Sequence, residues 1–198
     1  TWTNATWLVA LDPKSGEPGA FARAADFGLA AAEKRTDTTE KGDVEYEEKF
    51  VAVMENGALV AVDPKGTKTP VTGDLFVDAT LPDGTRVKSG LQLIKEAAFE
   101  RSFADWCKEA GLEPEAVADV AHELTSHGKH AAVDIHRGVS QHTNGFYNVL
   151  GWYTVNALLG NYDWQGGMSA LKTYSYDGKK GGPFDLSVVP GKIPTFGI

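Results

Sequence analysis

The strongest constraint on the fold lies in residues 131–159, where a short apolar run, a polar loop and a long apolar run follow one another. Residues 131–135 have the length and composition of a buried strand, and residues 146–159 are long enough and apolar enough for a helix. A strand, a loop and a helix in this order form the building unit of parallel α/β sheets. We therefore predict an α/β fold with a partial parallel-sheet domain, which is a Rossmann-like unit.

Two turn sequences upstream of this unit predict antiparallel hairpins. Asn56-Gly57 lies between two apolar runs, and both residues of so tight a turn need positive φ. A second turn, Pro-Asp-Gly-Thr at residues 82–85, follows a run in which apolar and polar residues alternate. The two hairpins together predict a small antiparallel β-hairpin subdomain.

The first 48 residues carry weaker signals. Residues 7–12 have the composition of a short strand, and the alanine-rich residues 21–32 could form a helix. Residues 36–48 contain six acidic side chains and few apolar ones. Because no helix brings these carboxylates to one point, we expect a solvated loop or insertion there rather than a metal-binding site.

Helical spacing of apolar residues begins at Leu91 and continues through residue 106, and Gly111 is expected to end this helix. Pro114 opens a second helix, after which Gly128 is expected as the stop. Cys107 is expected in the core as a small apolar residue. The chain then divides into three predicted parts: residues 1–48, a strand plus a variable loop or insertion; residues 49–90, the small antiparallel β subdomain; and residues 91–198, the α/β part.

The composition excludes several kinds of partner and site. A formal charge of −8 and a pI near 5.1 argue against nucleic acid, whose phosphates are bound mainly by clustered Lys and Arg. One cysteine cannot form an internal disulfide, an iron–sulfur cluster or a cysteine-rich zinc site. No run approaches the roughly 20 apolar residues that span a membrane. Because the chain begins at Thr1 without Met, we expect it to be a segment of a longer protein.

The polar loop before the last helix carries most of the chemistry in this sequence. Residues 135–145 combine a cation, an amide, a hydroxyl and the two imidazoles of His136 and His142 at the carboxyl end of the predicted strand, where ligands of open α/β sheets collect. Arg137 could make a two-pronged contact with an anion that also lies near the positive end of the helix. The alternative is a tight loop whose polar side chains cap the helix. His122, His127 and His130 lack the spacing of a shared metal site, so we expect them to be solvated.

The spacing of glycines and amides across this region resembles a known family. The pattern is Gly138-x-x-Gln141-x-x-x-Gly145, then an apolar helix, then Leu-x-Gly-Asn at residues 158–161 and Gly-Gly at residues 166–167. It is similar to the signature of the molybdopterin oxidoreductases of the dimethyl sulfoxide reductase superfamily. The resemblance implies a molybdenum ion held by two molybdopterin guanine dinucleotides, and an iron–sulfur cluster in an amino-terminal domain that this chain lacks.

The resemblance also assigns a role to the loop. Seven residues are expected to lie against one pterin dinucleotide, and Gln141 is the first choice among them: Arg137, Gly138, Ser140, Gln141, His142, Asn144 and Gly145. It assigns neither a catalytic residue nor a metal ligand to this chain, and Cys107 does not match the segment that carries the molybdenum-binding side chain. We therefore expect residues 91–198 to be a cofactor-binding part without reductase activity by itself.

Within the superfamily, residues 103–148 are most similar to the catalytic subunits of tetrathionate reductases, and arsenate, polysulfide and thiosulfate reductases resemble them nearly as well. This likeness implies two-electron reduction of an oxidised sulfur substrate or oxyanion in anaerobic respiration. It further implies a periplasmic complex with two partners, a membrane anchor subunit plus an iron–sulfur electron-transfer subunit. The competing interpretation is a stand-alone, non-catalytic α/β binding module that reuses a common loop.

Overall fold

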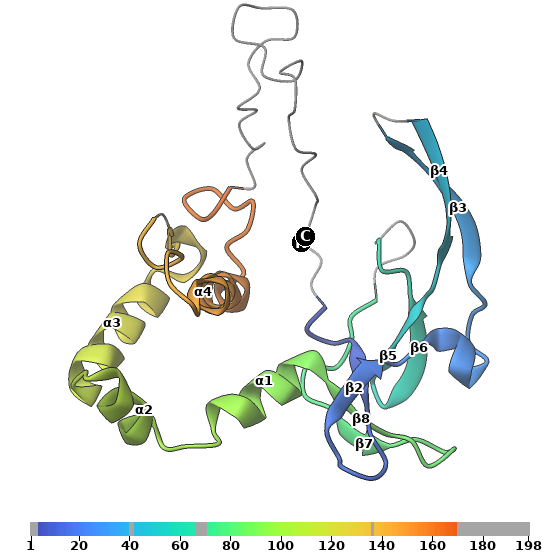
Figure 1. Ribbon diagram of the computed structural model, residues 1–198, viewed down its shortest axis with the longest axis horizontal. Coiled ribbons are helices and arrows are strands. Elements are labelled where there is room, and N and C mark those ends of the chain that lie inside the picture. The colour runs from blue at the N-terminus through green and yellow to red at the C-terminus, as the bar shows by residue number, and fades with distance from the viewer. Residues whose placement is uncertain (1–3, 40–41, 66–70, 136, 170–198) are drawn as a thin grey trace, which may run out of the picture. The chain divides into compact units, whose positions relative to one another are not determined.

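The computed structural model describes residues 4–39, 42–65, 71–135 and 137–169, and the chain divides into two compact units, residues 1–126 and 127–198 (Figure 1). The first unit contains the strands and three of the helices: β1 (Leu8–Leu11), β2 (Pro18–Phe21), η1 (Ala24–Phe27), β3 (Glu33–Thr39), β4 (Gly42–Glu48), β5 (Val51–Glu55), β6 (Ala58–Val62), β7 (Asp78–Thr80), β8 (Arg86–Ser89), α1 (Gly90–Ala98), α2 (Phe103–Ala110) and α3 (Pro114–Ser126). The second contains η2 (Gly128–His130) and α4 (Gly145–Leu159).

The first unit is built around an antiparallel sheet in the order β2-β1-β8-β7 and the two hairpins β3–β4 and β5–β6. Its larger core cluster is buried and apolar: Leu8, Ala22, Ala52, Val77, Leu81 and Val87. Leu8 and Val87, from neighbouring strands, are fully buried, and the hairpin β5–β6 adds a second buried cluster of Val51, Val53 and Val62.

Both predicted hairpins are confirmed. β5 and β6 join through Asn56 and Gly57, whose φ values of 51° and 78° are those that the tight turn requires. The carboxylate of Asp74 accepts hydrogen bonds from both backbone N–H groups of this turn, at 3.2 and 3.3 Å. β7 and β8 pair around the second turn, with Ala79 opposite Val87.

The expectation of a solvated loop at residues 36–48 is wrong. The segment belongs to the regular hairpin β3–β4, in which Glu33 faces Glu48 and Arg35 faces Tyr46. Most of its described side chains are exposed, and charged residues lie on both faces, which removes the alternation of apolar and polar residues that marks a half-buried strand. The guanidinium of Arg35 joins this hairpin to the end of β6 through the buried Asp63, with both pairs of atoms within 3.0 Å.

The helix that residues 21–32 could have formed is replaced by β2 and the short η1. Ala22 donates its N–H to the carbonyl of Leu8 and accepts one from Ala52, so pairing with two strands outweighs the helix propensity of alanine.

The single helix expected from Leu91 onward is two helices. Ser102 ends the connection between α1 and α2, and its hydroxyl accepts the N–H of Asp105 at 3.1 Å, which starts a new helix. The expected stop at Gly111, in the left-handed conformation, and the start of α3 at Pro114 are both confirmed. Cys107 is buried, as expected.

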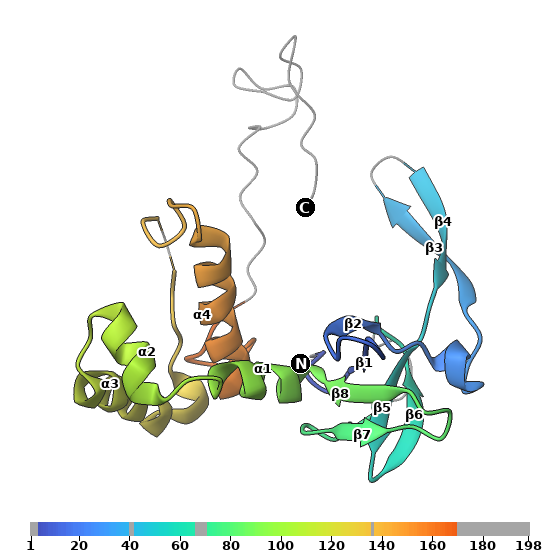
Figure 2. The ribbon, with the colours of Figure 1, turned by 60° about the horizontal axis from the view of Figure 1, so that its bottom comes forward.

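The α/β class is confirmed as a mixture of helices and small sheets, but the parallel sheet is not. Every ladder between named strands in the described residues is antiparallel, and residues 131–135 form no strand there, although Ala131 is extended. The segment runs alongside α4 in the second unit (Figure 2). A side chain of α4 takes the backbone hydrogen bonds of Val133 that a neighbouring strand would otherwise use. The three-part division at residues 48 and 90 stays a prediction.

Candidate functional site

The loop before α4 follows a tightly fixed path. Gln141 donates its N–H to the carbonyl of Gly138 at 3.0 Å, and Gly145 donates to the carbonyl of His142 at 2.9 Å. Gly138 has φ of +96°, a conformation that favours glycine. Gly145 is buried against Ser140, and a Cβ atom there would stand 2.2 Å from the carbonyl oxygen of that residue. Both glycines of the Gly-x-x-Gln-x-x-x-Gly motif are therefore explained by the backbone: Gly138 by its positive φ, and Gly145 by its close packing on Ser140.

The polar side chains of the loop point to solvent rather than into the fold. All six of them are exposed: Arg137, Ser140, Gln141, His142, Thr143 and Asn144. Asn144 is the N-cap residue of α4, yet its side chain makes no cap hydrogen bond. The side chains of Arg137, Ser140 and Gln141 have no hydrogen-bond or ion-pair partner in the residues that the structure describes. Their donors are free to contact a ligand. The alternative, in which the polar side chains of the loop cap the helix, is not what the structure shows for these three residues.

One side chain of the loop is held by the helix. The ring atom Nε2 of His142 lies 3.0 Å from the side-chain amide nitrogen Nδ2 of Asn148 in the first turn of α4. The backbone of Asn148 is fixed in turn, because its N–H donates to the carbonyl of Asn144 at 3.0 Å. The position of this imidazole therefore depends on the helix as well as on the loop.

Two buried asparagines connect α4 to the segment that leads into the loop. The side-chain amide of Asn156 accepts the N–H of Val133 at 2.9 Å and donates to its carbonyl at 2.8 Å, as a neighbouring strand would. Asn161 donates to the carbonyl of Ala131 at 2.6 Å and to the side-chain oxygen of Asn156 at 2.8 Å. Both asparagines are 0% exposed. This asparagine clamp, Asn156 with Asn161, fixes where the segment arrives at the loop.

The second half of the family signature has a structural explanation in this clamp. Gly160 ends α4 in the left-handed conformation, which turns the chain and places Asn161 beneath the helix. Gly167 packs on Asn161, and a Cβ atom there would lie 2.3 Å from its carbonyl oxygen. Gly166 has φ of +84°. The Leu-x-Gly-Asn and Gly-Gly elements therefore hold the clamp together.

Sequence reasoning missed Asn156 and Asn148. The signal for Asn156 was a lone amide in the middle of an otherwise apolar helix, a position that needs partners because an unpaired buried amide is costly. Asn148 carried no such signal, since its side chain is exposed and its role appears only through the distance to His142.

Three further histidines lie outside the loop, and His136 lies outside the described residues. His122, His127 and His130 are exposed, as expected, and the Nδ1 atom of His130 lies 3.0 Å from the carbonyl oxygen of Gln165. Within the described ranges, no group of three or more His, Cys, Asp or Glu residues could hold a metal ion.

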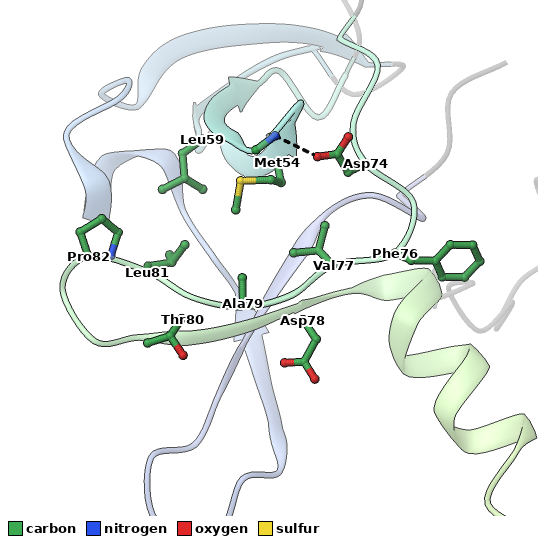
Figure 3. Close-up of a pocket in the computed structure, with 11 residues that line it drawn as sticks. Met54, Leu59, Asp74, Phe76, Val77, Asp78, Ala79, Thr80, Leu81 and Pro82 are labelled. Atoms are coloured by element: carbon green, nitrogen blue, oxygen red, sulfur yellow. Dashed lines mark hydrogen bonds between the residues drawn. The ribbon is translucent and has the colours of Figure 1, made fainter.

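A cavity of about 650 Å³ lies in the first unit, between the hairpin β5–β6 and strand β7. Val77, Ala79 and Leu81 face Met54 and Leu59 across it (Figure 3). Its two carboxylates are engaged within the fold: that of Asp74 by the turn of β5–β6, and that of Asp78 by Arg86 and Lys88. The cavity therefore presents apolar walls and no free acid–base pair.

Three curated proteins match this chain, and each is a subunit of a reductase. The selenate reductase subunit of Mesobacillus selenatarsenatis is 38% identical over 201 residues, which cover 100% of the chain and 18% of that protein. The tetrathionate reductase subunit of Salmonella typhimurium is 33% identical, again over 100% of the chain and 18% of the relative. Its counterpart in Archaeoglobus fulgidus is 30% identical over 87% of the chain and 13% of the relative. The chain thus spans less than a fifth of each relative.

Other comparisons add no further relatives. No protein-family model and no solved structure matches the chain. In the part of the chain that the structure describes, no helix has both the length and the apolar character needed to cross a membrane.

Proposed function

Because the chain belongs to the molybdopterin oxidoreductases of the dimethyl sulfoxide reductase superfamily, we propose that its loop at residues 137–145 binds one molybdopterin guanine dinucleotide of the reductase subunit. One observation carries the proposal. The loop holds an exposed guanidinium, amide and hydroxyl, none of them with a partner in the described residues, at the first turn of the 15-residue helix α4.

The donor set fits such a ligand chemically. Arg137 supplies a fixed positive charge with paired N–H donors for a phosphate, and Gln141 and Ser140 supply neutral donors and acceptors for a base or sugar. Gly138 and Gly145 leave the backbone uncovered by side chains, which allows a ligand to approach closely. Loop residues in this role bind and orient the cofactor, and they take no part in bond making.

The molybdenum centre, when bound, supplies the two-electron chemistry of the reaction. Residues 137–145 would hold the dinucleotide, so their contribution would be affinity and orientation. We accordingly assign no catalytic residue to residues 137–145. The chain by itself is expected to reduce neither tetrathionate nor selenate with a dye donor, and turnover by the purified chain would contradict this.

The substrate is proposed to be an oxyanion of sulfur or selenium. The relatives are named for selenate and tetrathionate, and the resemblance of residues 103–148 to tetrathionate reductases makes tetrathionate the first choice. A comparison of kcat/KM for the two oxyanions on the intact reductase decides between them. By the same likeness we propose that the reductase works in anaerobic respiration in the periplasm, with a membrane anchor and an iron–sulfur subunit as partners.

Thermal protection by a guanine nucleotide tests the assignment of the loop. GDP is expected to raise the Tm of the 198-residue chain, because a ligand that binds only the folded state adds about 2.7 kcal/mol of stability at 100 times its Kd. Arg137→Ala with Gln141→Ala should abolish that rise. Gln165→Ala, an exposed glutamine of the same unit outside the loop, should keep it. Equal protection of the double variant would refute the assignment.

A further inference from the structure

The contact between His142 and Asn148 bears on which ring nitrogen carries the proton, because the donor and acceptor roles in it depend on the tautomer of the ring. The amide nitrogen Nδ2 of Asn148 has two hydrogens and no lone pair to offer, so across 3.0 Å it can only donate. The atom that faces it, Nε2 of His142, must then be the bare acceptor. A neutral imidazole with a bare Nε2 carries its proton on Nδ1.

The opposite ring nitrogen is available to a ligand. His142 is exposed, and Nδ1 has no partner in the residues that the structure describes. The backbone of His142 is held by the N–H of Gly145, which donates to its carbonyl, and the ring is held by its contact with Asn148. A ring fixed in this way offers one N–H donor in a defined direction, on the same loop as Arg137.

We infer that Asn148 is a positioning residue that holds His142 in the Nδ1–H tautomer, so that the ring donates a hydrogen bond to an acceptor oxygen of the bound ligand. That the ligand is a pterin guanine dinucleotide rests on the proposed function. The tautomer rests on the geometry of the pair alone. With the other tautomer, a bare Nδ1 would present a lone pair to the same oxygen and repel it.

Nitrogen-15 NMR of the histidine rings tests the tautomer directly. The 198-residue chain, labelled on its five histidines, is measured near pH 8. The signals that disappear in His142→Gln belong to this ring. The expected spectrum has a protonated Nδ1 and a bare Nε2. A protonated Nε2 in the unmodified chain would overturn the inference.

Variants of the partner separate positioning from simple structural support. Asn148→Asp replaces the donor with a carboxylate that only accepts, so the proton of His142 should move to Nε2, while amide spectra confirm that the fold is kept. Gln165→Ala removes an exposed amide outside the loop, and it should leave the tautomer unchanged. The same tautomer in Asn148→Asp and in the unmodified chain would show that Asn148 does not set it.

Addition of GDP distinguishes this inference from the proposed function. A change in the Nδ1 signal of His142 that is lost in Asn148→Asp supports both. Failure of GDP to bind, with the Nδ1–H tautomer in place, refutes the ligand and leaves the positioning role standing. Binding of GDP to a chain whose ring is protonated on Nε2 refutes the positioning role alone.

Discussion

The two units of this chain differ in how far they bury the apolar side chains of their main elements. The first buries Leu8, Val51 and Val87 completely within its own sheets, and its exposed hairpin β3–β4 is polar. The second is built on α4, which has apolar residues on every side and leaves Tyr147 72% and Leu158 62% exposed. A helix that is apolar all round is normally buried all round. Within the described residues, α4 therefore lacks the apolar cover that the sheets of the first unit give to Leu8, Val51 and Val87.

The exposure of α4 is consistent with the small part of each relative that the chain covers. More than four fifths of the length of each matched reductase subunit lies outside the aligned region. Residues 131–135 run beside α4 and form no strand in the part of the chain that the structure describes. The asparagine clamp is the device that keeps this segment extended without a neighbouring strand.

The largest loss of stability is expected from a substitution in the core of the first unit. Leu8→Ala removes a fully buried side chain from the core, and the free energy of unfolding of the first unit should fall by about 2–5 kcal/mol. Urea unfolding followed by the fluorescence of Trp7, whose ring packs 5.2 Å from that of Phe21, measures the change. Exposed Val44→Ala, on the hairpin β3–β4, is the control and should cost little. Equal losses in both variants would contradict the assignment of the core.

The second largest loss of stability is expected from a substitution in the asparagine clamp. Asn156→Leu keeps the apolar character of α4 but leaves the N–H and carbonyl of Val133 without their partner, a loss of about 1–3 kcal/mol. Hydrogen exchange at residue 133 should accelerate, while exchange in β1 and β8 stays as it was. If the amide of Val133 remained protected in this variant, the strand-like role of Asn156 would be ruled out.

The smallest effects are expected from two glycine substitutions in α4, which should change the stability of the second unit in opposite directions. Gly145→Ala places a Cβ atom against the carbonyl of Ser140 and should destabilise the second unit by about 1–3 kcal/mol. Gly151→Ala places a Cβ atom where nothing lies within 4 Å and should stabilise the helix by roughly 0.5–1 kcal/mol. Thermal unfolding of the two variants gives the sign. Stabilisation by both would mean that the loop does not pack on Gly145.

Local chemistry made the turns and helix ends predictable. Asn56-Gly57, Gly111 and Pro114 each act through their own backbone preferences, so the sequence sufficed to place them. The hairpin β3–β4 was not predictable, because its stability depends on a buried pair between Arg35 and Asp63, 28 residues apart. The same applies to residues 131–135, whose composition favours a strand but whose ladder needs a partner from elsewhere.

The candidate site could also be predicted from the sequence only where local properties determine it. The sequence identified the loop and its exposed side chains, since glycine spacing and polar composition are local properties. It did not identify Asn148 or the role of Asn156, which follow from contacts across six and 23 positions of the chain. The Gly-Gly element, which the sequence offers only as a resemblance, is explained by its packing on Asn161.

The cofactor content of the intact reductase tests the central claim most directly. Molybdenum and pterin are quantified per polypeptide in the unmodified protein, in Arg137→Ala with Gln141→Ala, and in Gln165→Ala. If the loop binds one dinucleotide, the double variant should lose most of its molybdenum and pterin while its circular dichroism is unchanged, and Gln165→Ala should remain fully loaded. A folded double variant with full cofactor content would contradict the proposed role of the loop.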